Sequence, residues 1–190
     1  DVGARLAAVS DRQQLPYEFV VLNDSVPNAW AMPGGKIAVN RGLLTELKSE
    51  AELAAVIGHE IVHAAGRHAA RGMETQMVLS VGAAAVAVAA SDREYGRAVE
   101  AVAGTTAALL GVKYGRDLEL EADHYGMIYM ERAGYDPHAA VSLQETFVRL
   151  SNSKQSNWLA GLFASHPPSQ ERVDANRRFA AGFSDDLKKG

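Results

Sequence analysis

The sequence predicts a mostly helical α+β domain with one small antiparallel sheet, and three features of the chain support this class. Short runs of strand-forming residues, bounded by turn residues, occur near the N-terminus. Longer segments with helical periodicity and recognisable cap residues follow them. With 190 residues, 47% of them hydrophobic, the chain is long enough to bury a sizeable core. We therefore expect residues 1–190 to form a single domain.

The N-terminal part is expected to contain the whole sheet. In chain order, the expected elements are a helix over residues 1–13, strands over 18–22, 28–32 and 36–40, and a short helix over 42–48. Pro33, Gly34 and Gly35 separate the last two strands and are typical of a tight hairpin connection.

The next helix is expected from about Glu50 to about Arg71. Ser49, followed three residues later by Glu52, fits a capping box at its start. Apolar residues then recur without a proline until well past Met73, so nothing in the sequence ends the helix earlier.

Three later helices are expected, over residues 117–133, from Pro137 onward, and from about 168 to about 181. Gly134 suits the left-handed position after the first of them. Asp136 is expected to cap the second, which Pro137 opens.

Residues 73–113 contain two alanine-rich stretches, 77–90 and 98–112. Each is shorter than the ~20 residues that cross a bilayer as a helix. We expect a pair of closely packed helices here; the alternative is a lid near the active site or a peripheral membrane contact.

Composition limits the kind of partner and ligand. The net charge of −4 and the lack of a basic stripe argue against a nucleic-acid partner. Without cysteine, any metal must be held by His, Asp or Glu. The sequence starts at Asp1 rather than at a methionine, so we expect a processed or trimmed product, from which a signal peptide, lipid anchor or membrane segment could have been removed.

The most informative segment runs from Gly58 to His63 and contains the pattern His-Glu-x-x-His. On a helix, His59 and His63 lie on one face about one turn apart, so both can reach one metal ion. Glu60 between them can contact a water on that ion rather than the ion itself. The pattern is typical of a zinc hydrolase with two imidazole ligands and a glutamate general base.

A catalytic zinc usually takes a third protein ligand, and the segment around Glu119 offers one. Glu119 and Asp123 share a helix face, so Glu119 can bind the metal while Asp123 accepts a hydrogen bond from a ligand imidazole. Arg116 is expected to pair with these carboxylates, whereas Glu121 projects elsewhere. The alternative is a charged solvent face. His68 is expected to face solvent or to cap a helix.

Four segments resemble the zinc metallopeptidase family of the CAAX prenyl protease, HtpX and the periplasmic chaperone-protease BepA. They are residues 28–36, 58–63, 116–123, and 165–168 with Arg172. The resemblance implies a zincin-like (gluzincin) fold, one zinc ion per chain and endopeptidase activity on polypeptides, such as misfolded or envelope proteins. It also implies a periplasmic or envelope location, with partners at the membrane periphery or in outer-membrane assembly.

The resemblance also implies a role for His166, because the matching histidine of the family lies near the metal. His166 is expected either to donate to the developing oxyanion or to close the resting site as a fourth zinc ligand. The alternative is a helix cap beside two prolines. Arg172 is a second candidate for stabilising charge in the transition state.

One strand is expected to form the edge of the substrate cleft, where a polypeptide adds as a further strand. Its residues are Asn28, Ala29, Trp30, Ala31 and Met32. The competing class is a metal-bearing chaperone that binds unfolded chains without cutting them. The intact Glu60 favours an enzyme.

Overall fold

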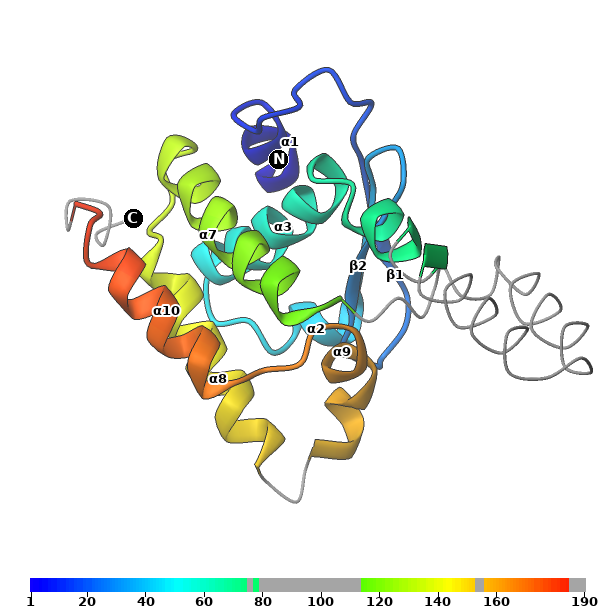
Figure 1. Ribbon diagram of the computed structural model, residues 1–190. Helices are drawn as coiled ribbons and strands as arrows, with labels where there is room; N and C mark the ends of the chain where they lie inside the picture. The colour runs from blue at the N-terminus through cyan, green and yellow to red at the C-terminus, as the bar shows by residue number, and fades with distance from the viewer. Residues whose placement is uncertain (75–76, 79–113, 153–155, 185–190) are drawn as a thin grey trace, which may run out of the picture.

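One helix, α3 (Glu50–Ala65), runs through the middle of the protein (Figure 1). The computed structural model describes residues 1–74, 77–78, 114–152 and 156–184. Helices pack on α3 from one side and the sheet from the other, so every residue from Ala54 to Ala64 is buried. The helices that contact α3 are α1 (Val2–Ala7), α7 (Arg116–Arg132) and α8 (His138–Ser151).

Both ends of α3 have a local cause. The N–H of Glu52 donates to Ser49 Oγ over 3.1 Å, which confirms the predicted cap. The Glu52 carboxylate accepts from the N–H of Lys48 (2.7 Å) rather than of Ser49, so the reciprocal half of the box is absent. The helix ends at Gly66, so the predicted extension to Arg71 is wrong.

The small sheet consists of β1 (Glu18–Leu22), β2 (Ala29–Met32) and β3 (Lys36–Asn40), in the order β1-β3-β2. Strands β2 and β3 form the predicted hairpin, in register Ala29↔Val39 to Met32↔Lys36. Gly34 and Gly35 make its turn with φ of +89° and +88°, values that disfavour other residues.

The sheet is mixed rather than wholly antiparallel, which corrects the sequence prediction. β1 pairs with β3 in parallel, in register Glu18↔Lys36 to Leu22↔Asn40. The cause is the connection over residues 23–28, which carries the chain past the end of β3 to the far edge. Asn40 holds it there: its backbone N–H donates to Asn28 O (2.9 Å) and its side chain to Val26 O (2.8 Å).

Further helical elements lie below α3 in Figure 1. They are α2 (Arg41–Leu44), a 3₁₀ turn at Ser156–Leu159, α9 (Ala160–Ser165) and α10 (Gln170–Ala180). α10 packs on α7 and α8, and the N–H of Arg172 donates to the side chain of its cap, Ser169. Gly134 follows α7 with φ of +82°, as predicted. The 3₁₀ turn and α9 were not predicted.

The crossing of α3 and α7 depends on two glycines. A Cβ on Gly58 would lie 3.2 Å from the carbonyl oxygen of Gly126, and a Cβ on Gly126 would lie 3.2 Å from the backbone nitrogen of His59. The two backbones therefore approach more closely than helices with side chains at these positions could.

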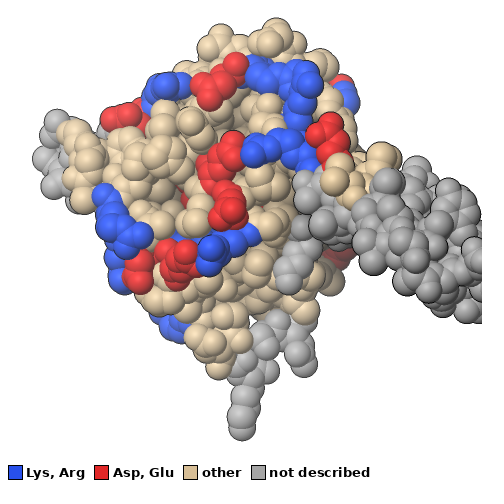
Figure 2. Space-filling view, in the orientation of Figure 1, with Lys and Arg blue, Asp and Glu red and all other residues tan. Residues whose placement is uncertain are grey.

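The core is built on α3 and its neighbours. The fully buried side chains include Leu6, Ile37, Leu43, Ile61, Tyr129, Met130 and Leu159. Within the described ranges, no helix combines the length and the apolar character needed to cross a membrane. The two alanine-rich stretches, 77–90 and 98–112, lie almost wholly outside those ranges. On the face shown in Figure 2, basic and acidic side chains are interspersed rather than gathered by sign.

Candidate metal centre and active site

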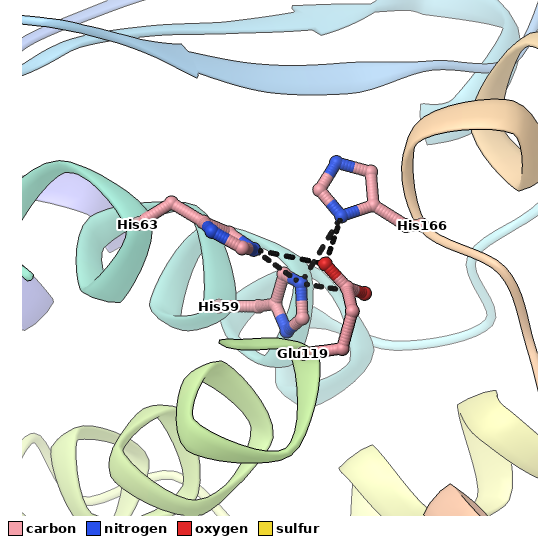
Figure 3. Close-up of side chains that lie close together, drawn as sticks. All are labelled: His59, His63, Glu119 and His166. Atoms are coloured by element: carbon pink, nitrogen blue, oxygen red, sulfur yellow. Dashed lines mark hydrogen bonds and ion pairs between the residues drawn. The ribbon is translucent and has the colours of Figure 1, made fainter. Parts of the chain in front are cut away.

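Four side chains that lie far apart in the sequence converge beside α3 (Figure 3). His59 and His63 come from α3, Glu119 from the first turn of α7, and His166 from the residue directly after α9. All four are buried, and one donor atom from each lies within 4.8 Å of the others.

The spacing of these donor atoms fits one zinc ion. Four ligands about 2.0–2.1 Å from a tetrahedral zinc lie about 3.3–3.4 Å from one another. Here His59 Nε2 lies 3.0 Å from His63 Nε2 and 3.3 Å from His166 Nδ1. Glu119 Oε1 lies 3.3 Å from His63 Nε2 and 3.2 Å from His166 Nδ1. Three imidazoles and one carboxylate are ligands that zinc takes readily.

The carboxylate of Asp123 and the guanidinium of Arg172 form hydrogen bonds with members of this cluster. Asp123 Oδ1 lies 2.9 Å from His59 Nδ1, the ring nitrogen that faces away from the cluster. In metal sites, a hydrogen bond to the ring nitrogen that does not bind the metal fixes the tautomer and orientation of the ligand histidine. Arg172 in turn donates to both oxygens of Asp123 and to Glu119 Oε2, each over 2.7 Å.

These contacts bear on two sequence predictions. Arg172 is buried, and its Nε, Nη1 and Nη2 all donate to Asp123 or Glu119, so it holds these carboxylates in place; its expected part in the transition state stays a prediction. Arg116 does not join them: its exposed side chain contacts Glu171 at 3.3 Å. Arg116 opens α7, where a side chain leans toward the N-terminal end and away from the cluster.

His68 and Tyr114 are two neighbours of the site that sequence reasoning missed. His68 was expected to face solvent or cap a helix, yet it is fully buried with Nδ1 2.9 Å from His63 Nδ1. The Tyr114 ring stacks on His63 with centroids 3.9 Å apart. For His68, the one signal in the sequence is Gly66, because a glycine there can end the helix and turn the His68 side chain inward. Nothing in the sequence singled out Tyr114. Glu121 projects away from the cluster, as expected, and contacts Arg71.

Without a metal ion, burial and neighbouring charges shift the pKa values of His59, His63 and Glu119 away from their usual values. Burial opposes charge on His59, but Glu119 and Asp123 outweigh it and raise the pKa of His59 to about 10. For His63, burial dominates and holds the pKa well below its usual value. Burial also opposes charge on Glu119, yet the neighbouring histidines lower the pKa of its carboxyl. The carboxylate is therefore ionised and ready to bind a cation.

Glu60 lies beside the cluster and next to a small cavity. It is buried, its Oε1 lies 3.4 Å from His166 Nε2, and its Oε2 has no hydrogen-bond partner among the described residues. A cavity of about 40 Å³ adjoins it. Most of its walls are apolar, and the polar side chains that line it are His59, Glu60, Asp123, Gln144, His166 and Arg172. A buried carboxylate with one oxygen unpaired beside a cavity is typical of a general base awaiting substrate.

The expected edge strand lines two cavities that border this site. β2 is indeed an edge of the sheet, and Ala29 lines the small cavity. Ala31 and Met32 line a second cavity of about 230 Å³, which also contacts His63. Asn28 lies just before the strand and Trp30 within it.

The central helix with two histidines, the glutamate from a second helix and the small sheet define a zincin-like metallopeptidase domain. Comparison with known families agrees: residues 1–179 match peptidase family M48, and the chain belongs to this family. Zinc is the metal that the family and the buried cluster together indicate.

Several characterised proteins are similar to this chain. It is 33% identical over 167 residues to mitochondrial metalloendopeptidase OMA1 of Arabidopsis thaliana, covering 87% of this chain and 32% of that protein. It is 29% identical over 185 residues to the beta-barrel assembly-enhancing protease of Escherichia coli, covering 93% and 37%. Metalloprotease YcaL of Escherichia coli is 31% identical over 169 residues, covering 88% and 64%. The chain thus spans about a third of the first two relatives.

Proposed function

We propose that this chain is the single catalytic domain of a zinc metalloendopeptidase, with His59, His63 and Glu119 as the metal ligands. The observation that carries the proposal is Glu60, whose unpaired carboxylate oxygen is buried beside a four-donor cluster of zinc-like spacing. A structural zinc site would need no such neighbour, because all of its positions are filled by ligands.

Each side chain then has a defined task in peptide hydrolysis. Zinc, when bound, lowers the pKa of a water and polarises the scissile carbonyl. Glu60 accepts the proton of the attacking water and delivers it to the leaving nitrogen. Asp123 orients the imidazole of His59 through Nδ1, and Arg172 keeps both Asp123 and Glu119 in place.

The substrate is proposed to lie along β2 as an added strand. An edge strand offers unpaired backbone groups to an extended peptide, which explains recognition of many sequences. The small cavity beside Glu60 then receives one side chain. Its volume of about 40 Å³ corresponds to about three water-sized groups, or a side chain such as valine. Its walls include Leu143, Phe147 and Leu162, which favour an apolar residue.

His166 is proposed to be a fourth ligand that closes the site at rest. Its Nδ1, rather than Nε2, faces His59 and Glu119, at 3.3 and 3.2 Å. A site with four protein ligands leaves no position for water and resembles structural zinc. Catalysis then requires that His166 move aside, so the enzyme is latent until its substrate or a partner displaces the ring.

The polypeptides cut are proposed to be misfolded or envelope proteins, in a periplasmic or envelope setting near outer-membrane assembly. The support is the similarity to the beta-barrel assembly-enhancing protease, whose name places it in that process. Fractionation of the source cells tests the location: recovery in the cytoplasmic fraction would contradict it.

The decisive experiment compares Glu60→Gln with Glu52→Gln in cleavage of an unfolded protein such as casein. Both glutamates are buried on α3, but Glu52 only accepts a backbone hydrogen bond that glutamine can also accept. Glu60→Gln should abolish zinc-dependent cleavage while zinc remains bound, and Glu52→Gln should cut normally. Equal cleavage by both variants, or cleavage that survives a chelator, would refute the proposal. Mapped cleavage sites should show a small apolar residue beside the cut bond.

A further inference from the structure

His68 lies directly behind His63, on the side away from the metal cluster. Its side chain is fully buried, its Nδ1 is 2.9 Å from His63 Nδ1, and the two rings are nearly perpendicular, at 88°. His63 Nε2 points the opposite way, toward His59 and Glu119. The imidazole ring of His63 therefore contacts the cluster through Nε2 and His68 through Nδ1.

The backbone between the two histidines is shaped to allow this contact. A Cβ on Gly66 would lie 2.4 Å from His68 Nε2, a distance that real side chains do not reach, so only glycine leaves space for the ring. Arg67 adopts a left-handed conformation with φ of +54°, which L-residues with side chains disfavour. Strained backbone of this kind persists where the surrounding structure requires it.

The tautomers of the two histidines follow from this geometry. A His63 that presents Nε2 to zinc must carry its proton on Nδ1, so Nδ1 is the donor. His68 Nδ1 must then accept, which leaves its proton on Nε2. That nitrogen has no hydrogen-bond partner among the described residues; the carboxylate of Glu121 lies nearby, with Oε1 3.6 Å away. Glu121 is itself held by Arg71 at 3.2 Å.

We propose that His68 is a positioning residue for the metal centre: it accepts the Nδ1–H of His63 and so fixes the tautomer and ring orientation in which His63 binds zinc. His68 does for His63 what Asp123 does for His59. The difference is chemical, because a neutral imidazole accepts without adding negative charge beside the cluster. The inference rests on the proposed ligand set, in which His63 binds through Nε2.

Zinc affinity, measured by competition with a chelator of known affinity, tests the proposal without relying on activity. His68→Ala should weaken zinc binding about 10–100-fold, the usual cost of losing a partner of a ligand histidine. His68→Asn, whose amide can stand where Nδ1 stands, should restore most of the affinity. Leu6→Ala removes a fully buried core side chain away from the cluster, so it should lower stability but leave zinc affinity unchanged.

Gly66→Ala provides an independent route to the same loss, because the new Cβ displaces the His68 ring. It should weaken zinc binding in the wild-type background and have little further effect when combined with His68→Ala. Additive losses in the double variant would show that Gly66 acts through something other than His68, and would contradict the argument from its Cβ.

Nitrogen-15 NMR of the zinc-loaded wild-type protein reads the tautomers directly. The expected result is a proton on Nδ1 of His63 and on Nε2 of His68; a proton on Nδ1 of His68 would overturn the proposal even if His68→Ala failed to fold. His63→Ala separates the two levels of inference. If it keeps zinc, the proposed ligand set fails. If it loses zinc while His68→Ala binds within twofold of wild type, only the role of His68 fails.

Discussion

Arg172→Met should destabilise the zinc-free protein severely, because Arg172 is the only guanidinium that the structure shows bridging Asp123 and Glu119 within the described residues. All three side chains are almost inaccessible to solvent, with exposed fractions of 3%, 6% and 1%. Methionine has a similar shape but removes the guanidinium that donates to both buried carboxylates, which leaves His59 as their remaining charged partner. Breaking such a pair costs about 3–5 kcal/mol, most of it the penalty of an uncompensated buried charge.

Urea unfolding in the presence of a chelator measures this cost. With a slope of about 2 kcal/mol per molar urea, the midpoint should fall by about 1.5–2.5 M. Arg177→Met on the same helix is the matched control, since its pair with Glu145 is about half exposed on both sides. That control should lose no more than about 1 kcal/mol. Equal losses for the two variants would refute the argument that burial decides the cost.

The pH dependence of the difference provides a second check. Burial would raise the pKa of Asp123, but Arg172 outweighs it and holds that pKa below its usual value. A carboxyl with a lowered folded-state pKa contributes stability above its unfolded value of about 3.9, and this contribution is lost as the pH falls. The gap between wild type and Arg172→Met should therefore be largest near neutral pH and narrow below about pH 4.

Three further outcomes follow from the site. Glu119→Gln should lose both zinc and activity, whereas Glu121→Gln, which lies off the cluster, should bind zinc within about threefold of wild type. Elemental analysis after dialysis measures the bound zinc, and reversed effects of the two variants would refute the assignment. Because the pKa of His59 is about 10 without metal, zinc binding at pH 7.5 should release about one proton from it. Calorimetry in buffers of different ionisation enthalpy counts that proton, and a count of zero would contradict the pKa. His166→Ala should keep zinc and hold or raise the cleavage rate; a fall of about a hundredfold would instead assign His166 to the oxyanion.

Local patterns in the sequence predicted much of the fold and part of the candidate site. The bounds of β1 and β3 and the cap of α3 depend on residues adjacent in sequence, and they were predicted correctly. The face shared by His59 and His63, like that shared by Glu119 and Asp123, is a property of any helix with that spacing. Such features need no knowledge of the tertiary structure.

The features that depend on long-range packing could not be predicted in this way. The parallel pairing of β1 with β3 results from a crossing connection, not from the pattern of either strand. Arg116 was favoured over Arg172 because it is near Glu119 in sequence, yet α10 brings Arg172 to the carboxylates from 49 residues beyond Asp123. His68 was misjudged because its direction depends on a helix end at Gly66 that the apolar periodicity conceals.

The close crossing at Gly58 and Gly126 fixes the distance between the metal ligands on α3 and the ligand on α7. Ligands from α3 and α7 are set apart by a backbone-to-backbone contact, which cannot adjust as packed side chains do. One added methyl group at either glycine would have to open the gap by a few tenths of an ångström, since a contact of 3.2 Å is tighter than nine in ten real Cβ contacts. Zinc coordination tolerates about 0.2 Å. The displacement that one methyl group requires is thus as large as the deviation in zinc–ligand distance that the metal tolerates. Natural variation at the two positions should therefore be confined to glycine.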